Sequence, residues 1–322
     1  MNLFRRLSVL SIVAGLLAST KQVMAQSTIE LDLSASSKFG EQITFIANLN
    51  SPLSIQSASI LIHDSTQVIT RIEPVTFNEQ GVSEFRFDTQ QNLIRPFTTV
   101  LWRYELTLAD GSKLQSQTAS VRYDDDRFAW QAREGNGFRV HWYHGGDGFG
   151  MSALNAGSAG MQKIAELFTP DPSSPVDIFI YANESDLRGT LYGAGEAWAA
   201  GHADSEAGVV TVTIEAGADQ NILMEQRIPH ELMHVMLHRQ VGVGYKNIPA
   251  WLREGVAMLA EVYPNPEYDR FLMDAAAREL ELDRVELRRR NVVRAAELPW
   301  RAPGGAVVAG WSSSRPPAAS RP

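Results

Sequence analysis

The chain has 322 residues, and its hydrophobic fraction of 44% supplies enough apolar material for two folded domains of ordinary size. The formal net charge of −8 argues against nucleic acid or an anionic membrane surface as the main partner, because both would repel an acidic protein. The sequence contains no cysteine, so any metal site must use histidine and carboxylate ligands.

Residues 1–25 have the pattern of a secretory signal peptide. Two arginines precede an apolar run at residues 7–18, and residues 23–25 offer small side chains for cleavage. An uncleaved N-terminal anchor is the alternative, but the apolar run is short for a bilayer and Lys21 follows it closely. We therefore expect an exported protein (secreted, periplasmic or on the cell surface) with no membrane span once the signal is removed.

Residues 26–124 alternate apolar and polar side chains in short runs separated by turn-forming pairs such as Asp110-Gly111. The clearest runs lie at residues 43–46, 58–62, 82–87 and 101–106. Several short alternating strands with frequent turns favour a small antiparallel β-sandwich. We interpret this part of the chain as a binding or spacer module.

From residue 125 to about residue 300 the pattern mixes strands and helices. Strands are expected at 138–142, 176–181 and 208–214, and helices at 151–168, at 220–240 and after Pro249. This mixture predicts an α+β domain, so the fold class of the whole chain is α+β with an all-β start. Residues 301–322 are rich in Gly, Ala, Ser, Pro and Arg without periodicity, which predicts a disordered tail.

The segment His230-Glu231-Leu232-Met233-His234 carries the strongest chemical signal. Histidines four residues apart on a helix present both imidazoles on one face, where they can bind one metal ion. Glu231 lies beside them, where a carboxylate can take a proton from a water that zinc has acidified. The alternative is a core helix with hydrogen-bonded histidines; the apolar residues between and after the histidines favour a metal, which would satisfy the buried polar groups.

A third ligand is expected 20 residues further on, at Glu254. Pro249 suits a helix start, and Trp251, Leu252 and Val256 form an apolar face on that helix. Two histidines and one glutamate with an open fourth position make a catalytic zinc arrangement. A solvated surface glutamate is the alternative for Glu254.

Residues 228–261 resemble the gluzincin metallopeptidases, the thermolysin-like group that combines HExxH with a downstream glutamate. The resemblance rests on IPHELMH at residues 228–234 and PAWLREG at residues 249–255. It is most similar to the peptidase MA-like domains of exported bacterial proteins, and it extends more loosely over residues 138–290.

The resemblance implies a zincin-like fold that hydrolyses peptides or proteins, with Zn²⁺ held by His230, His234 and Glu254 and with Glu231 as general base. It also implies that the strand at 208–214 is the sheet edge that pairs with an extended substrate. Tyr245, 11 residues after His234, matches a tyrosine that hydrogen-bonds the tetrahedral intermediate in thermolysin-like enzymes. A turn residue after Gly242 and Gly244 is an equal alternative for Tyr245.

Two features depart from the family pattern. Members usually carry an acid four positions after the glutamate ligand, where it supports a metal-binding histidine, but this sequence has Met258 there. Whether Glu261, one turn further on, reaches the histidine is left open by the sequence. The pattern of ordered elements also fades after Trp300, where family members continue with helices, so a C-terminally truncated domain is an alternative.

The four other histidines of residues 125–300 receive no role. His238 lies one turn beyond His234, too far along the helix axis to share the ion. His202 is interpreted as a loop residue, and no motif surrounds His141 or His144. The competing function is a non-catalytic exported binding module with a degenerate zinc-peptidase fold, and a surface structural protein is a third reading. The sequence gives no indication of the oligomeric state.

Overall fold

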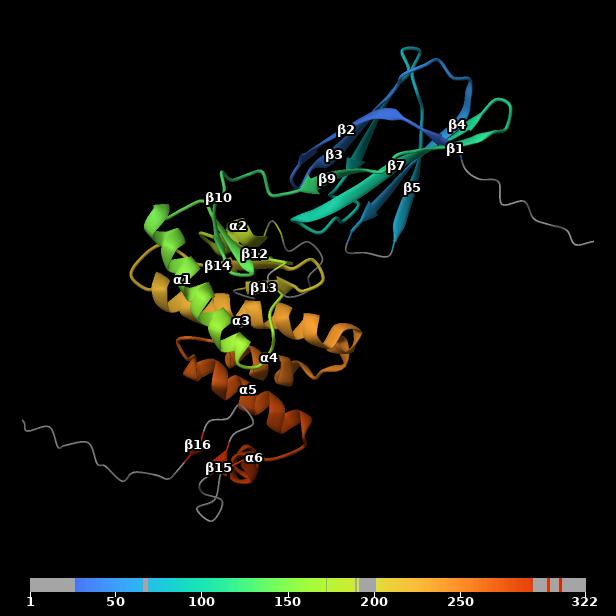
Figure 1. Cartoon of the computed structure of the whole chain (residues 1–322). Coiled ribbons are helices and arrows are strands. Elements are labelled where there is room, and N and C mark those ends of the chain that lie inside the picture. The colour runs from blue at the N-terminus through green and yellow to red at the C-terminus, as the bar shows by residue number, and fades with distance from the viewer. Residues whose placement is uncertain are drawn as a thin grey trace, which may run out of the picture.

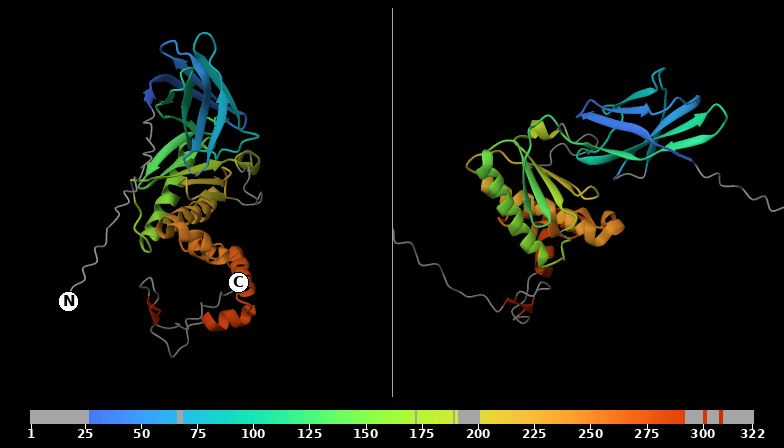
Figure 2. Two further views of the ribbon diagram at one scale, coloured as in Figure 1. Left: turned by 90° about the vertical axis from the view of Figure 1, so that its right-hand side faces the viewer. Right: turned by 45° about the horizontal axis from the view of Figure 1, so that its top comes forward.

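The computed structural model describes residues 27–65, 69–171, 173–188, 190, 201–291, 300–301 and 307–308. The expected signal peptide at 1–25 and most of the expected tail at 301–322 lie outside these residues. Figure 1 and Figure 2 show a strand-rich N-terminal region at one end and a mixed region of strands and helices at the other. Within the described part of the chain, no helix is long and apolar enough to cross a membrane.

The N-terminal region forms two sheets. One has the order β1-β8-β7-β4-β5 with β9 also on β7, and the other has the order β2-β3-β6. The strands are β1 (Ser27–Ile29), β2 (Leu31–Lys38), β3 (Gln42–Leu49), β4 (Ile55–Asp64), β5 (Thr70–Val75), β6 (Val82–Asp88), β7 (Thr98–Leu108), β8 (Lys113–Ser116) and β9 (Ala119–Tyr123). The four alternating runs identified in the sequence lie in β3, β4, β6 and β7, so these strand predictions are confirmed.

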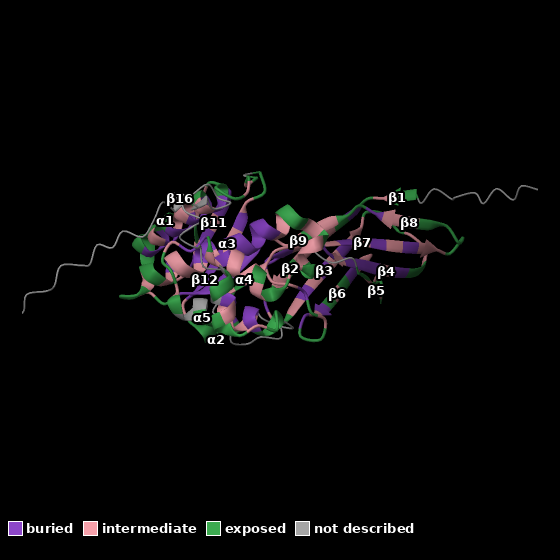
Figure 3. Ribbon diagram, turned by 90° about the horizontal axis from the view of Figure 1, so that it is seen from below, coloured by how far each residue is buried: buried purple, intermediate pink, exposed green. Residues whose placement is uncertain are grey.

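Alternation along the strands creates the core of this region. Buried and half-buried residues alternate through β3 and β7, as expected for strands with one face inward, and buried residues line β4 and β7 in Figure 3. Phe45 of β3 and Trp102 of β7 lie in contact with ring centroids 5.1 Å apart. The two sheets therefore share one hydrophobic core.

The second region contains a five-stranded sheet with the order β10-β11-β12-β14-β13. Its strands are β10 (Gln131–Gly135), β11 (Phe138–Trp142), β12 (Val176–Tyr181), β13 (Gly201–Asp204) and β14 (Val209–Thr213). Its helices are α1 (Gly146–Ala165), α2 (Glu184–Arg188), α3 (Gln220–Val241), the 3-10 helix η1 (Gly242–Asn247), α4 (Ala250–Met258), α5 (Pro266–Glu279) and α6 (Arg284–Asn291). After these helices, two strands of two residues each, β15 (Trp300–Arg301) and β16 (Val307–Val308), pair with each other.

The expected elements of this region form, with one correction. The strand predicted at 208–214 is β14, and it is not at the edge: β12 pairs with it in parallel and β13 pairs with it on the other side. All five residues of β14 are buried, as suits a strand with neighbours on both sides. The edge strand is β13, which runs antiparallel to β14.

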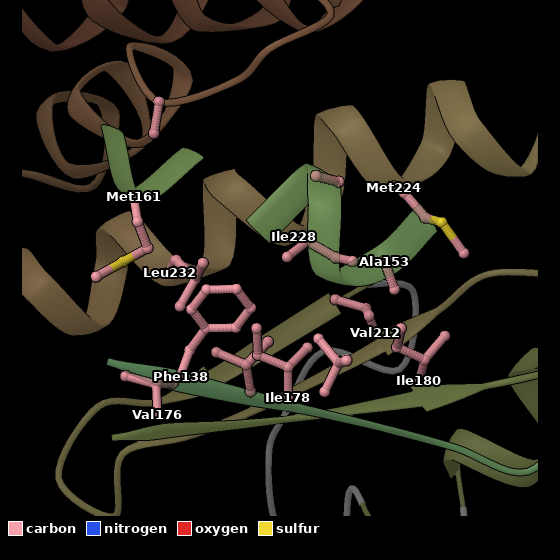
Figure 4. Close-up of a cluster of buried hydrophobic side chains, with 14 of the residues drawn as sticks. Phe138, Ala153, Met161, Val176, Ile178, Ile180, Val212, Met224, Ile228 and Leu232 are labelled. Atoms are coloured by element: carbon pink, nitrogen blue, oxygen red, sulfur yellow. The ribbon is translucent and has the colours of Figure 1, made fainter. Parts of the chain in front are cut away.

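Helices α1 and α3 cover one face of this sheet. Figure 4 shows Ile228 and Leu232 of α3 pointing toward Ile178 and Val212 of the sheet. All four side chains are fully buried, with relative exposures of 0%. Burying these side chains holds α3 against the sheet, because each large aliphatic side chain that is buried adds about 1.5–3 kcal/mol to the stability of the fold.

One glycine lets α1 approach α3 closely beside the histidine pair. A Cβ at Gly160 of α1 would lie only 2.6 Å from the ring of Pro229 in α3. Pro229 lies inside α3 and directly precedes His230. The contact between Gly160 and Pro229 therefore positions the backbone of α3 next to His230.

An aromatic cluster joins the two regions. Phe97, which precedes β7, stacks on Phe179 of β12 with centroids 3.5 Å apart, and only 1% of Phe97 is exposed. Its backbone has a φ of 60°, an uncommon value for a residue with a side chain. Nearby, Arg95 forms ion pairs with Asp204, the last residue of β13, at 3.1 Å and with Glu206 at 3.1 Å.

Candidate metal centre

Three side chains converge between α3 and α4. The rings of His230 and His234 leave the same face of α3, with centroids 4.9 Å apart. Glu254 of α4 places Oε2 at 3.2 Å from Nε2 of His230 and at 3.5 Å from Nε2 of His234. One possible ligand atom from each residue lies within 4.8 Å of the other two. The structure thus brings together all three residues that the sequence nominates as metal ligands.

Glu231 lies on the side of α3 that faces the edge strand. A Cβ built at Gly201 of β13 would come within 2.6 Å of Oε1 of Glu231. The backbone of β13 therefore passes directly against this carboxylate. Gly201 could not be recognised from the sequence, because a glycine followed by residues of low strand propensity does not predict a strand.

Glu261 reaches His230, which the sequence left open. Its Oε1 lies 2.9 Å from Nδ1 of His230, and the Glu261 side chain is 5% exposed. The chain turns at the end of α4 and brings Glu261 back toward α3. Lys163 of α1 donates a hydrogen bond to the Glu261 carbonyl, and the next amide, of Val262, donates to the carbonyl of Glu225 in α3.

Tyr245 of η1 lies at the second histidine. Its hydroxyl is 3.3 Å from Nδ1 of His234. The Tyr245 ring is held edge-to-face against His238 at 5.3 Å, and the guanidinium of Arg253 lies 5.1 Å from its centroid. Burial is the main reason that the pKa of Tyr245 is raised above its ordinary value.

The segment that carries the candidate metal centre matches a known protein family. Residues 156–287 match the model of the Peptidase MA superfamily. This stretch is a peptidase MA-like domain. It contains α3, α4 and therefore all the residues of the candidate centre.

Solved structures offer only distant likenesses. OgpA from Akkermansia muciniphila is 18% identical over 32% of this chain and 29% of that protein, with a TM-score of 0.26. A β-1,3-glucan binding domain of carbohydrate-binding module family 56 is 12% identical over 29% of this chain and 98% of its own, with a TM-score of 0.22. A polysaccharide deacetylase from Bacillus cereus is 10% identical over 72% and 77%, with a TM-score of 0.26. No curated protein matches the chain.

The electrostatics of the peptidase MA-like domain centre on His230. Burial disfavours the charged imidazolium, but hydrogen bonds to Glu254 and Glu261 outweigh this effect and raise the pKa of His230 to about 10. In the metal-free protein the charged imidazolium of His230 donates one proton from Nδ1 to Glu261 and the other from Nε2 to Glu254. A metal cation at the Nε2 side would replace that proton while leaving the Nδ1 contact to Glu261 intact.

The donor set fits a zinc ion. Zinc–ligand bonds of about 2.0–2.1 Å in a tetrahedral site put neighbouring ligand atoms about 3.3 Å apart. The separations of Glu254 Oε2 from the two Nε2 atoms, 3.2 and 3.5 Å, bracket that value. Both Nδ1 atoms have partners on the opposite side of their rings, as metal-binding imidazoles usually do.

The remaining histidines of this region take no ligand position. His238 contacts Tyr245 and is outside the ligand cluster. His202 is not in a loop as expected but on β13, and the alternation of a strand directs it away from the face where Gly201 meets Glu231. His141 binds the carboxylate of Asp177 at 2.8 Å.

Proposed function

We propose that this protein is an exported zinc-dependent peptidase. The observation that carries the proposal is the convergence of the half-buried His230, the buried His234 and Glu254, with Glu231 one residue after the first histidine. The match to the Peptidase MA superfamily supports the same class of reaction. Peptides or proteins are therefore the proposed substrates.

In this proposal His230, His234 and Glu254 hold the ion and leave a fourth position open. When bound, zinc supplies Lewis acidity, which polarises a peptide carbonyl and lowers the pKa of water toward 7. Glu231 accepts a proton from the attacking water and delivers it to the departing amine, so the carboxylate is restored at the end of the cycle.

The same proposal gives the edge strand a role. Strand β13 ends the sheet order within the described residues, and in this proposal an extended peptide pairs with its outer side. Because Gly201 touches Glu231, a peptide added along β13 would run past the general base. The N-terminal module at 26–124, the peptidase domain at 125–300 and export through a signal at 1–25 belong to the proposal as further elements.

The test combines metal analysis with cleavage of a broad peptide library. Wild-type protein should contain one zinc per chain and hydrolyse a subset of the peptides. Glu231→Gln should retain zinc and lose hydrolysis, because glutamine keeps the shape but cannot accept the proton. Glu215→Gln, at an exposed position just after β14, is the matched control and should behave as wild type.

Two outcomes would contradict the proposal. Full activity in Glu231→Gln would remove the general base from the mechanism. Stoichiometric zinc in the wild type without hydrolysis of any peptide or unfolded protein would instead indicate a binding module with a peptidase-like fold.

A further inference from the structure

The two ligand histidines are held differently at their outer nitrogens. His230 meets a carboxylate, from Glu261, and His234 meets a phenol hydroxyl, from Tyr245. Glu261 follows α4 and Tyr245 belongs to η1, so the two partners come from separate segments. Each contact is on Nδ1, whereas Nε2 of both rings faces Glu254.

The two nitrogens of an imidazole point away from each other, so a group at Nδ1 is on the far side of the ring from a ligand at Nε2. With Nε2 committed to a metal, Nδ1 keeps its proton and donates it to an acceptor. A tyrosine oxygen accepts such a hydrogen bond. With a metal at Nε2, the 3.3 Å contact would therefore hold both the tautomer and the orientation of His234.

We infer that Tyr245 is a positioning residue that acts on the metal through His234, and that it does not donate to the reacting carbonyl. This inference rests on the proposed zinc site. It departs from the role that the gluzincin resemblance implies for Tyr245, which is stabilisation of the tetrahedral intermediate. The geometry explains the difference: the hydroxyl is already engaged behind the ligand ring.

The surroundings of Tyr245 hold it in that place. His238, one turn after His234 on α3, packs edge-to-face on the tyrosine ring. Arg253, the residue before Glu254 on α4, covers the ring with its guanidinium. The ring is thereby fixed between the two helices that supply the metal ligands, and this gives His238 and Arg253 a function that neither had from the sequence.

Tyr245→Phe separates the two roles, because it removes the hydroxyl and keeps the ring. If Tyr245 is a positioning residue, the Tyr245→Phe variant should bind zinc about 10–100-fold more weakly, while its kcat at saturating zinc stays close to wild type. If Tyr245 is instead an oxyanion donor, the variant should keep the wild-type zinc affinity while its kcat at saturating zinc falls about 10²–10³-fold. Zinc affinity is measured by competition with a chelator and kcat on a peptide that the wild type cleaves.

Two measurements keep the result interpretable. The first is the melting temperature of metal-free Tyr245→Phe compared with that of metal-free wild type. A merely structural role of Tyr245 would lower this melting temperature without a specific effect on zinc affinity. Tyr263→Phe removes a hydroxyl from a half-exposed tyrosine after α4 and should leave zinc affinity unchanged.

The inference is overturned if Tyr245→Phe binds zinc as tightly as wild type, or if metal-free Tyr245→Phe loses stability and no zinc-specific change remains. Failure of the proposed function looks different: wild-type protein itself would bind no zinc or cleave nothing. A wild type that binds zinc and cleaves, together with an unchanged zinc affinity in Tyr245→Phe, would refute the inference alone.

Discussion

Gly201 of β13 lies directly against the carboxylate of Glu231 on α3, close enough that an added Cβ would come within 2.6 Å of Oε1. A second contact of that Cβ would be with Val212 of the neighbouring strand, at 3.1 Å. The carboxylate is thus confined between its own helix and the edge of the sheet. A side chain at 201 would crowd this carboxylate and would not strain the backbone, since the φ of Gly201 is not in the left-handed region.

Gly201→Ala should displace the Glu231 carboxylate and reduce peptide hydrolysis. A shift of about 1 Å in a catalytic group can cost about 100-fold in rate, and we expect a loss in kcat of that order. The zinc content should stay at the wild-type level because the ligands are not touched. Gly217→Ala, at a position with open space around it, is the control. Unchanged kcat in Gly201→Ala would mean that the general base has room to adapt.

His234→Ala should lower the zinc content from about one ion per chain to a small fraction of that after dialysis, since a catalytic zinc site has only three protein ligands to lose. Metal analysis of the purified variant measures this directly. His144→Ala, at an exposed bend after β11, should retain full zinc. A zinc content in His234→Ala equal to that of wild type would show that the ion binds elsewhere.

Zinc should also stabilise the folded chain. A ligand present at about 100 times its dissociation constant adds about 2.7 kcal/mol to the free energy of unfolding. For a domain of this size, that corresponds to a rise of about 5–10 °C in Tm. The comparison is between chelator-treated protein and the same protein with zinc restored, and Glu231→Gln should show the same rise. A Tm that does not respond to zinc would contradict a site built from folded elements.

The ligand set was predictable because its information is local. The spacing of His230 and His234 fixes both rings on one face of any helix, and α3 is a helix over that whole stretch. Glu254 could be predicted as a ligand for the same reason, because it lies on a second apolar helix that begins after Pro249. Its distance from the histidines, however, follows from the packing of α4 on α3, which no local pattern contains.

The parts that could not be predicted depend on long-range contacts. Strand β13 exists because β14 pairs with it, and its sequence, Gly-His-Ala-Asp, has little intrinsic preference for a strand. Glu261 reaches His230 only because Lys163 and Glu225, from two other helices, hold the backbone around it. The two sheets of the N-terminal region, by contrast, could be read from alternation along β3 and β7, since one face of each strand is buried.

Glu261→Gln should weaken zinc binding about 10–100-fold, because a neutral amide is a poorer acceptor for the Nδ1 proton of His230 than a carboxylate. Met258→Glu should not tighten it. The position that a family member's acid would serve is already occupied by Glu261, and a second carboxylate nearby would be unpaired. Chelator competition on both variants measures the effect. Tighter binding in Met258→Glu would show that His230 is incompletely supported in the native protein.

Arg95 provides a test of whether the N-terminal region affects the site. Its guanidinium pairs with Asp204 at the end of β13 and with Glu206 just beyond, and Glu206 also faces Lys246, the residue after Tyr245, at 3.4 Å. Loss of the arginine should therefore loosen the edge strand without touching a metal ligand. The side chain of Arg95 is 36% exposed, so solvent screening limits its contribution to about 1 kcal/mol or less.

We accordingly expect Arg95→Ala to reduce kcat/KM by up to about fivefold, through a higher KM for peptides that pair with β13, while zinc affinity is unchanged. Arg103→Ala removes an arginine that pairs with Glu105 at 3.6 Å on the surface of the N-terminal region, and it should have no effect on kcat/KM. Equal behaviour of the two variants would mean that the edge strand keeps its position without Arg95. The aromatic contact of Phe97 with Phe179 would then be sufficient to join the two regions, because it buries an apolar surface that the ion pair does not.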